Sequence, residues 1–336
     1  MSKEIKVVFA ILPKVHLIDL SGPVQVFYEA NQFGANFKIE YCGLKDNDTV
    51  YAQQGLQFAG LQSFEHVELS KNDYLFIPGM EFSSIKEGQL ASGYADFYNW
   101  MHAQYKKEVN ICTVCSGTFV LAESNMLTNR TCTTHWKCID YLKTNYTSIK
   151  VVNDQLYVKD GHMYTSAGMT SGIDMALFIV EENFGPVITS KVAREMVVFL
   201  RRPGGDSQGS IYLDFRTHIH PAIHTVQDYI IQHPTGKNSI EELAEMVNMS
   251  ERNLTRLFRK HTGISINDFK TKCRLSHAES LLKHPGYTID YIASQCGFAD
   301  GRQLRRMWKE HYGNSPSSFR DAKEVSRITS DKKPVL

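Results

Sequence analysis

Long hydrophobic runs are missing from this 336-residue sequence. No apolar stretch approaches the roughly 20 residues that a membrane-spanning helix requires, so we expect no membrane as a partner. The opening MSKEIKVVFAILPK has a short apolar run but carries acidic Glu4, and the continuation HLIDLSGP does not resemble the cleavage site of a secretory signal. We therefore expect a first buried strand here and a cytoplasmic protein.

An excess of one charge is also missing, since 37 Lys and Arg stand against 36 Asp and Glu. The two signs are unevenly distributed, however. Acidic residues outnumber basic ones by 23 to 19 up to residue 219, and basic residues lead by 18 to 13 beyond it. The basic C-terminal part is thus the part suited to a polyanion. A solvated basic surface would carry the same charge, so charge alone does not decide.

Cysteine is scarce, with seven residues in the chain. An odd count in a chain of this length fits a reducing compartment better than a disulfide framework. Cys112 and Cys115, followed by Cys132, His135 and Cys138, have a superficial zinc spacing. Residues three apart on a strand point to opposite faces, so these side chains should diverge, and we expect no metal and no cofactor. Apart from Cys115, these cysteines are expected in the core.

Short apolar runs alternate with helical patterns over the first 200 residues. We expect strands at 5–12, 37–44, 73–79, 109–115 and 131–136, a hairpin at 153–168 turning at Asp160-Gly161, and helices at 22–31, 90–105 and 170–185. This alternation predicts a flavodoxin-like three-layer α/β sandwich with a mostly parallel sheet.

A chain of this length is too long for one ordinary core, and the Gly-, Pro- and Ser-rich segment RRPGGDSQGS marks a break in composition at 201–210. We place a first domain at 1–205, a linker at 206–221, an all-α domain at 222–325 and a disordered tail at 326–336.

One helical pattern occurs twice beyond residue 220. Residues 239–263 predict a helix, a tight turn and a second helix, and residues 287–313 repeat the arrangement after a connecting helix over 266–284. The second helix of such a pair can enter the major groove of DNA, where its outward side chains reach base edges and phosphates. The outward residues are Arg252, Thr255, Arg256 and Arg259 in the first pair, and Arg302, Gln303, Arg305 and Arg306 in the second.

The segments LAEMVNMSERNLTRLFRKHTG and GFADGRQLRRMWKEHYGNSPSSFR resemble the DNA-binding domain of the AraC family of transcription regulators, over about residues 222–321. The resemblance implies two recognition helices that bind double-stranded DNA at a promoter. By position, Arg252, Thr255 and Arg256 and the four outward residues of the later helix would reach bases. Gly301 and Arg302 depart from the small polar residues that the family often has there.

Cys115 stands between an apolar strand and a helical pattern, in ICTVCSGTFVLAE. A nucleophile on such a turn lies at the carboxyl end of the sheet, where open α/β sheets bind ligands. The N-terminus of the following helix is expected to lower the pKa of the thiol. Asp19 follows the first strand and His135 ends a later one, so the three side chains could converge as a catalytic set or a binding pocket.

This part resembles the ThiJ/PfpI family of the class I glutamine amidotransferase-like fold over about residues 4–203, through IDLSGPVQVF, IPGM, CSGTFVLAESNMLTNRTCTTHW and TSAGMTSGIDMALFIVEENFG. In that family Cys115 matches the elbow cysteine, Asp19 an acidic residue beside it and His135 a later histidine. Peptidase-like members have a histidine directly after the cysteine, where this chain has Ser116. The implied effector pocket comprises Asp19, Gly79, Cys115, Ser116 and His135.

The whole chain resembles the GlxA-like subgroup of AraC regulators, in which a ThiJ/PfpI-type domain precedes the DNA-binding domain. The resemblance implies a dimeric transcription regulator, an activator that works with RNA polymerase, whose first domain senses a small nitrogen compound such as a betaine, carnitine or a basic amino acid. Two alternatives stay open. The first domain is a cysteine-dependent hydratase or amidase, or Cys115 is a redox sensor.

Overall fold

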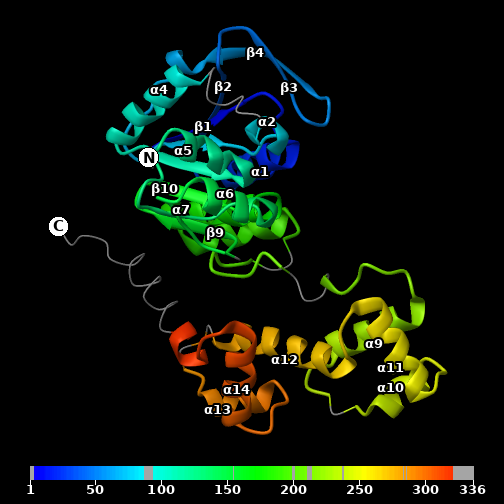
Figure 1. Ribbon diagram of the computed structural model, residues 1–336. Helices are drawn as coiled ribbons and strands as arrows, with labels where there is room; N and C mark the ends of the chain where they lie inside the picture. Colours follow the sequence, from blue (N-terminus) through cyan, green and yellow to red (C-terminus); the bar gives the residue numbers. More distant parts are fainter. Residues whose placement is uncertain are drawn as a thin grey trace. The chain divides into compact units, whose positions relative to one another are not determined.

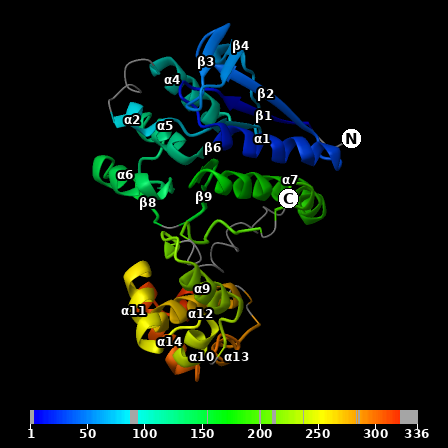
Figure 2. The same ribbon diagram turned by 90° about the vertical axis from the view of Figure 1, so that its right-hand side faces the viewer.

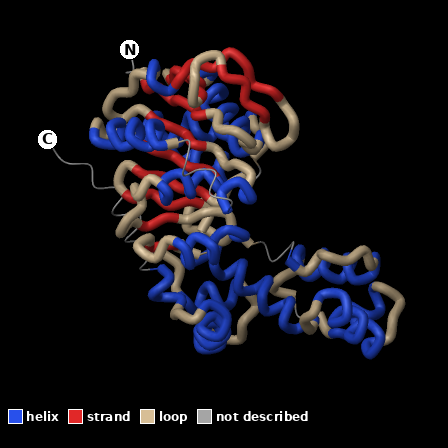
Figure 3. The backbone as a smooth tube through the Cα atoms, turned by 45° about the horizontal axis from the view of Figure 1, so that its top comes forward, coloured by secondary structure: helices blue, strands red, loops and turns tan. Residues whose placement is uncertain are grey.

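The computed structural model describes residues 4–86, 94–153, 155–198, 201–209, 214–236, 238–282, 284 and 286–320. The chain divides into two compact units, Met1–Gln208 and Gly209–Leu336. All described strands belong to the first unit, and the described part of the second unit is helical (Figure 3). The predicted tail at 326–336 and the start of the helix predicted at 90–105 lie outside the described residues.

Eight described strands form one sheet in the first unit, in the order β3-β4-β2-β1-β5-β6-β10-β9 (Figure 1). These strands are β1 (Ile5–Ala10), β2 (Phe37–Gly43), β3 (Asp48–Tyr51), β4 (Gln57–Ser63), β5 (Tyr74–Ile77), β6 (Asn110–Val114), β9 (Tyr157–Asp160) and β10 (Met163–Ser166). All neighbours from β4 to β10 are parallel, and the edge strands β3 and β9 are antiparallel to theirs. The mostly parallel sheet is therefore confirmed. Two short strands, β7 (Thr131–Cys132) and β8 (Lys150–Val151), form a separate parallel pair.

Helices cover both faces of this sheet. On one face α1 (Leu17–Gln32) and α7 (Thr170–Glu195) run alongside each other (Figure 2), and on the other lie α4 (Ala95–Lys106), α5 (Thr118–Glu123) and α6 (Ile139–Asn145). The short helices α2 (Phe82–Lys86), η1 (Phe64–His66), η2 (Cys115–Gly117) and η3 (Trp136–Cys138) lie in the connections. In β1, Val8 joins the core under α4 and α5, whereas Val7 and Phe9 join the core under α1 and α7. A strand buried on both faces needs no polar alternation, which explains the apolar run over residues 7–12.

Two helices differ in extent from their predictions. The first begins at Leu17 rather than at Gly22, so Pro23 lies inside it instead of in its first turn. Its beginning is supported from outside the helix, because the Leu17 amide donates to Gln54 Oε1 at 3.2 Å. The helix predicted at 170–185 is broken at Gly185, which has a φ of 80°, but a further stretch continues in α7 to Glu195.

The segment 201–208, which composition marks as the start of a linker, is attached to the first unit. Arg202 Nε donates to the Asp174 carboxylate at 3.0 Å, and the carbonyl of Gly204 accepts the Leu156 N–H at 2.8 Å. Gln208 Nε2 donates to backbone carbonyls near β7 and β9. These bonds explain why the first compact unit extends to Gln208.

The second unit contains two helix-turn-helix segments around a shared helix. Its helices are α9 (Pro221–Gln232), α10 (Ile240–Met246), α11 (Glu251–Thr262), α12 (Ile266–Leu282), α13 (Ile289–Gln295) and α14 (Gly301–Tyr312). Phe269 and Cys273 of α12 pack with α9, α10 and α11, whereas Leu275 and Leu282 pack with α13 and α14. Both predicted helix-turn-helix segments, α10–α11 and α13–α14, are confirmed, and α12 serves as a core element for both. Among the described helices, none is both long and apolar enough to cross a membrane.

Replacing Arg202 by Met should destabilise the first unit, because the Asp174 side chain is only 4% exposed and loses its charge partner. Burial raises the pKa of Asp174 even with Arg202 in place. We expect the free energy of unfolding to fall by about 3 kcal/mol at pH 7. The loss should be smaller at pH 5, because protonation of a carboxyl whose folded-state pKa is raised relieves the cost.

Denaturant titration followed by amide exchange in α7 measures this loss. Arg194→Met, on an exposed residue of the last turn of α7, is the matched control and should leave the stability unchanged. An equal loss for Arg202→Met at both pH values would rule out the buried charge as its cause.

Candidate functional site

Cys115 lies directly after β6 on the strained turn that the sequence predicts. Its φ is 56°, a left-handed backbone conformation that few residues other than glycine adopt. Two glycines leave room for it. A Cβ on Gly168 would lie 2.8 Å from Cys115 Sγ, and one on Gly79 would lie 2.8 Å from Cys115 Cβ and 2.4 Å from Asp19 Oδ2. The Thr134 hydroxyl donates to the Cys115 carbonyl at 2.8 Å and holds the turn from the other side.

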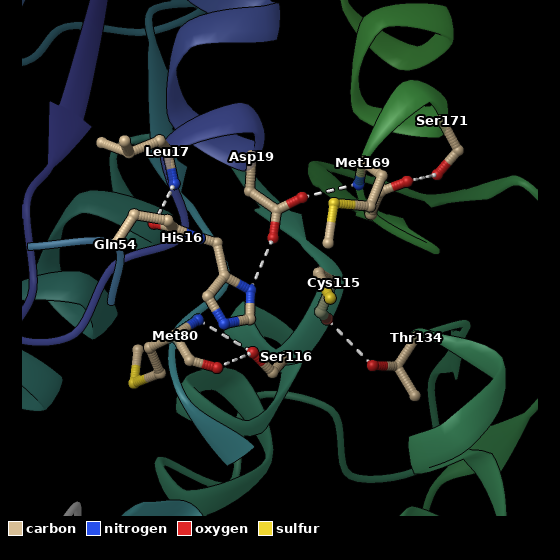
Figure 4. A network of polar contacts seen from close by, with 11 residues as sticks. His16, Leu17, Asp19, Gln54, Met80, Cys115, Ser116, Thr134, Met169 and Ser171 are labelled. Atoms are coloured by element: carbon tan, nitrogen blue, oxygen red, sulfur yellow. Dashed lines mark hydrogen bonds and ion pairs between the residues drawn. The ribbon is translucent and has the colours of Figure 1, made fainter. Parts of the chain in front are cut away.

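The Asp19 carboxylate lies next to the elbow and is wholly buried. Its Oδ1 accepts the Met169 N–H at 2.6 Å, and its Oδ2 lies 3.3 Å from His16 Nδ1 (Figure 4). That pair is not aligned as a hydrogen bond, and neither His16 Nδ1 nor Asp19 Oδ2 has another well-aligned one among the described residues, although the Cys115 thiol lies within reach of the carboxylate. A ring nitrogen of His16, a carboxylate oxygen of Asp19 and the sulfur of Cys115 all lie within 4.8 Å of one another. The structure therefore brings Asp19 and Cys115 together as predicted.

The imidazole in this group belongs to His16, which the sequence analysis did not single out. The spacing of three residues between His16 and Asp19, at the start of a helix, is the signal that could have found it. His135 lies beyond the two-residue strand β7, where it caps η3 by accepting the Lys137 N–H on Nδ1 at 3.3 Å. Burial and Lys137 lower the pKa of His135, whereas the charge of Asp19 raises it. It thus lies within electrostatic range of the group but is not one of its three members.

Ser116 is used for support. Its hydroxyl oxygen accepts the Met80 N–H at 2.8 Å and donates back to the Met80 carbonyl at 2.5 Å. With 1% of its surface exposed, it fastens the end of β5 to the elbow and offers little to a ligand.

The charge state of Cys115 differs from the expectation. The helix N-terminus was expected to lower the pKa of the thiol, but burial raises it well above its usual range and the Asp19 carboxylate raises it further. The Ser116 backbone amide opposes these effects without outweighing them. Cys115 is 4% exposed and is a neutral thiol at pH 7. A neutral thiol is a poor nucleophile and a poor metal ligand, so the geometry that could hold a cation here lacks the matching charge.

Two hollows of the first unit lie away from this group. One, of about 490 Å³, is lined by residues at the amino ends of the strands, among them Asp73, Asn110 and His162. The other, of about 730 Å³, lies between α1 and β4 and is lined by Leu20, Val24 and neighbours. Neither is lined by Asp19 or Cys115, so the effector pocket stays a prediction that rests on the side-chain group.

Replacing Asp19 by Asn should increase the reactivity of Cys115. Removal of the carboxylate lowers the thiol pKa, and each unit of pKa gives about ten times more thiolate. We expect faster alkylation of Cys115 by iodoacetamide at pH 8, measured by mass spectrometry. The buried Cys112 of the same molecules is the internal control and should not change. Slower alkylation in Asp19→Asn would show that the carboxylate activates the thiol.

The second unit presents two helices of matching design, α11 and α14. Each is capped at its start by a side chain that accepts a backbone N–H, Ser250 from Asn253 and Asp300 from Gln303, and each ends at a left-handed glycine. The outward residues are exposed on both helices: Arg252, Thr255, Arg256, Arg259, Arg302, Arg305 and Arg306. Gln303 differs, because it is half-buried and its Oε1 accepts the Ala299 N–H at 2.7 Å.

Gly301, the departure noted in the sequence, is required by a close approach. Its N–H donates to Asp290 Oδ1 at 3.0 Å, and a Cβ at this position would lie 2.3 Å from the same atom. The Asp290 carboxylate of α13 thereby binds the first turn of α14.

Comparison with known proteins agrees with both units. A profile of the DJ-1/PfpI family matches residues 5–182, more than half of the chain. The chain belongs to the DJ-1/PfpI family. A profile described as a helix-turn-helix domain matches residues 243–322 of the same chain. This DJ-1/PfpI protein is therefore of the AraC type, and the predicted combination of domains is confirmed.

Three relatives illustrate the family. The HTH-type transcriptional regulator CdhR of Pseudomonas aeruginosa is 26% identical over 314 residues, which cover 93% of this chain and 90% of the relative. The HTH-type transcriptional regulator GlxA of Rhizobium meliloti is 29% identical over 216 residues, 63% of this chain and 65% of the relative. The isonitrile hydratase of Pseudomonas putida is 28% identical over 200 residues, 59% of this chain and 80% of the relative. The family thus includes both regulators and an enzyme.

Proposed function

We propose that this AraC-type DNA-binding transcriptional regulator is a dimeric activator that responds to a small nitrogen-containing effector. The observation that carries the proposal is the repeated design of α11 and α14, whose exposed faces are rich in arginine while their other faces are buried. Arginine contacts phosphates and the edges of guanine, so two such helices suit two segments of the major groove. The surplus of basic residues beyond residue 219, 18 against 13, favours the same partner.

The effector site of the proposal is the group formed by His16, Asp19 and Cys115. A buried carboxylate oxygen that has no well-aligned hydrogen bond, with only His16 and the Cys115 thiol beside the group, favours a ligand that brings a cationic or N–H-bearing nitrogen. The groups on this site are small and polar, which suits a compact ligand. Its binding would alter DNA affinity only if the effector prefers one arrangement of the two domains over the other. Dimerisation supplies two linked DNA-binding domains and hence the affinity that one lacks.

The alternative is that the first domain is a cysteine-dependent hydratase or amidase. The elbow geometry of Cys115 and the similarity to an isonitrile hydratase favour it. The raised pKa and the burial of the thiol oppose it, and they oppose a redox sensor for the same reason, since both roles need an accessible thiolate. Rapid alkylation of Cys115 in the unmodified protein at pH 7 would favour these alternatives.

Replacing Arg252 or Arg302 by Ala should weaken binding to a promoter fragment from the neighbourhood of its gene. The two residues occupy equivalent exposed positions on α11 and α14. We expect each substitution to cost about 1–3 kcal/mol of binding free energy if the arginine contacts a base, and to relax specificity at that position. Fluorescence anisotropy over a salt series measures affinity and salt dependence together.

Arg194→Ala, on an exposed arginine of the first unit, is the matched control and should bind as the unmodified protein does. Absence of DNA binding by the unmodified protein at low salt would contradict the proposed function.

A further inference from the structure

Four histidines of the second unit lie together away from both sites described above. His218 and His220 precede α9, His224 lies in its first turn, and His261 lies in the last turn of α11. The ring centroids of His218 and His224 are 4.6 Å apart, those of His218 and His261 5.4 Å, and those of His220 and His261 5.0 Å. Residues distant in the sequence thus bring four imidazoles into one cluster.

The segment ahead of α9 turns its histidines inward in preference to an apolar residue. Along THIH, Thr217 and Ile219 are exposed, whereas His218 and His220 are half-buried. Ile219 is 94% exposed, although isoleucine is among the residues most often found inside proteins. Hydrophobic burial alone would select the opposite side of the segment, so the inward position of the imidazoles has another cause.

The cluster also holds ring nitrogens that the protein does not satisfy. His220 Nδ1 and His224 Nε2 are buried and have no hydrogen-bond partner among the described residues, and His218 Nε2 has no well-aligned one, although the Gln227 side chain lies within reach of the ring. His218 Nδ1 accepts only a 3.3 Å contact from the His220 N–H. Buried polar atoms are normally paired, so the unpaired nitrogens of His220 and His224 point to a ligand that accepts their lone pairs.

We propose that His218, His220, His224 and His261 bind a divalent transition-metal cation, with Zn²⁺ the best match. Imidazole is a preferred ligand of this class of ion, and four ligands satisfy its tetrahedral geometry. Two imidazoles bound to one such ion through Zn–N bonds of ~2.0–2.1 Å have ring centroids about 5 Å apart. The three centroid distances of the cluster, from 4.6 to 5.4 Å, lie in this range.

Binding requires the rings to turn and not the backbone to move. The cluster does not bring three ring nitrogens within 4.8 Å of one another, a spacing that occurs among the described residues at His16, Asp19 and Cys115. The proposal requires rotation about the side-chain bonds to direct nitrogens of adjacent rings to a common point. His218 gives up its weak contact with the His220 N–H whichever nitrogen binds, because Nδ1 then either holds the ion or carries the ring proton.

Neutral imidazole is the form that binds metals. A bound ion would join the segment ahead of α9 to the end of α11.

The test uses the full chain without a histidine tag, stripped of metal by a chelator and carrying Cys115→Ser to remove the thiol of the other candidate group. Competition against a Zn²⁺-binding dye should show one tightly bound Zn²⁺ per chain. Mg²⁺, which prefers oxygen ligands, should not displace this Zn²⁺. The double variant H218Q/H224Q should lose more affinity than the about 10–100-fold that loss of a merely supporting residue costs. H233Q is the matched control, since His233 lies at the end of α9 and bonds the Tyr229 carbonyl, and it should bind Zn²⁺ unchanged.

The proposal is overturned by equal Zn²⁺ affinity of the unmodified cluster and H218Q/H224Q, and equally by loss of the tightly bound ion with Cys115→Ser alone. A Co²⁺ spectrum without a thiolate charge-transfer band would support nitrogen ligands, and one with that band would contradict them. Should H218Q/H224Q fail to fold by circular dichroism, the single variant H261Q decides, and unchanged affinity in it overturns the proposal.

Discussion

The buried carboxylate of Asp19 is the interaction on which the first unit's candidate site depends. It receives the N–H of Met169 from the start of α7, faces His16 at the start of α1, and lies against Gly79 after β5. The same group contains Cys115 at the end of β6. Four separate parts of the fold therefore meet at one charge, and any ligand that changes the charge or the hydrogen bonding there acts on all of them. A deeply buried, half-satisfied carboxylate is a costly feature for stability alone, which favours a binding role.

The second unit depends on a different constraint, the sharing of α12 by two small cores. Phe269 faces one core and Leu282 the other, so neither helix-turn-helix segment can move independently of the long helix between them. This arrangement fixes the separation of α11 and α14, which two contacts on one DNA molecule require. The hydrogen bond from the Gly301 N–H to the Asp290 carboxylate then attaches the first turn of α14 to α13.

The sequence predicts the architecture well, because local patterns of residues determine most of the helices and strands. The apolar runs of the strands, the elbow at Cys115 and the two capped helix pairs all follow from neighbouring residues. The candidate site is only half predictable, because its details come from distant contacts. His16 was not predicted because α1 begins at Leu17 and not at Gly22. The start of the helix is held by a hydrogen bond from the Leu17 N–H to the Gln54 side chain, and not by a side-chain cap. The predicted shift of the Cys115 pKa had the wrong direction, because burial and the Asp19 charge outweigh the effect of the helix terminus. Neither the burial nor Asp19 can be read from ICTVCSGTFVLAE.

We propose that the group around Asp19 controls DNA binding by the second unit. Its most direct test is the DNA affinity of the full chain with and without glycine betaine, carnitine and arginine, for the unmodified protein, for Asp19→Ala and for Asp140→Ala, an exposed control on α6. We predict that one compound shifts the affinity of the unmodified protein and of Asp140→Ala by about 5–150-fold. Asp19→Ala should bind DNA and show no shift. A shift of the same size in Asp19→Ala would contradict control of DNA binding by the Asp19 group.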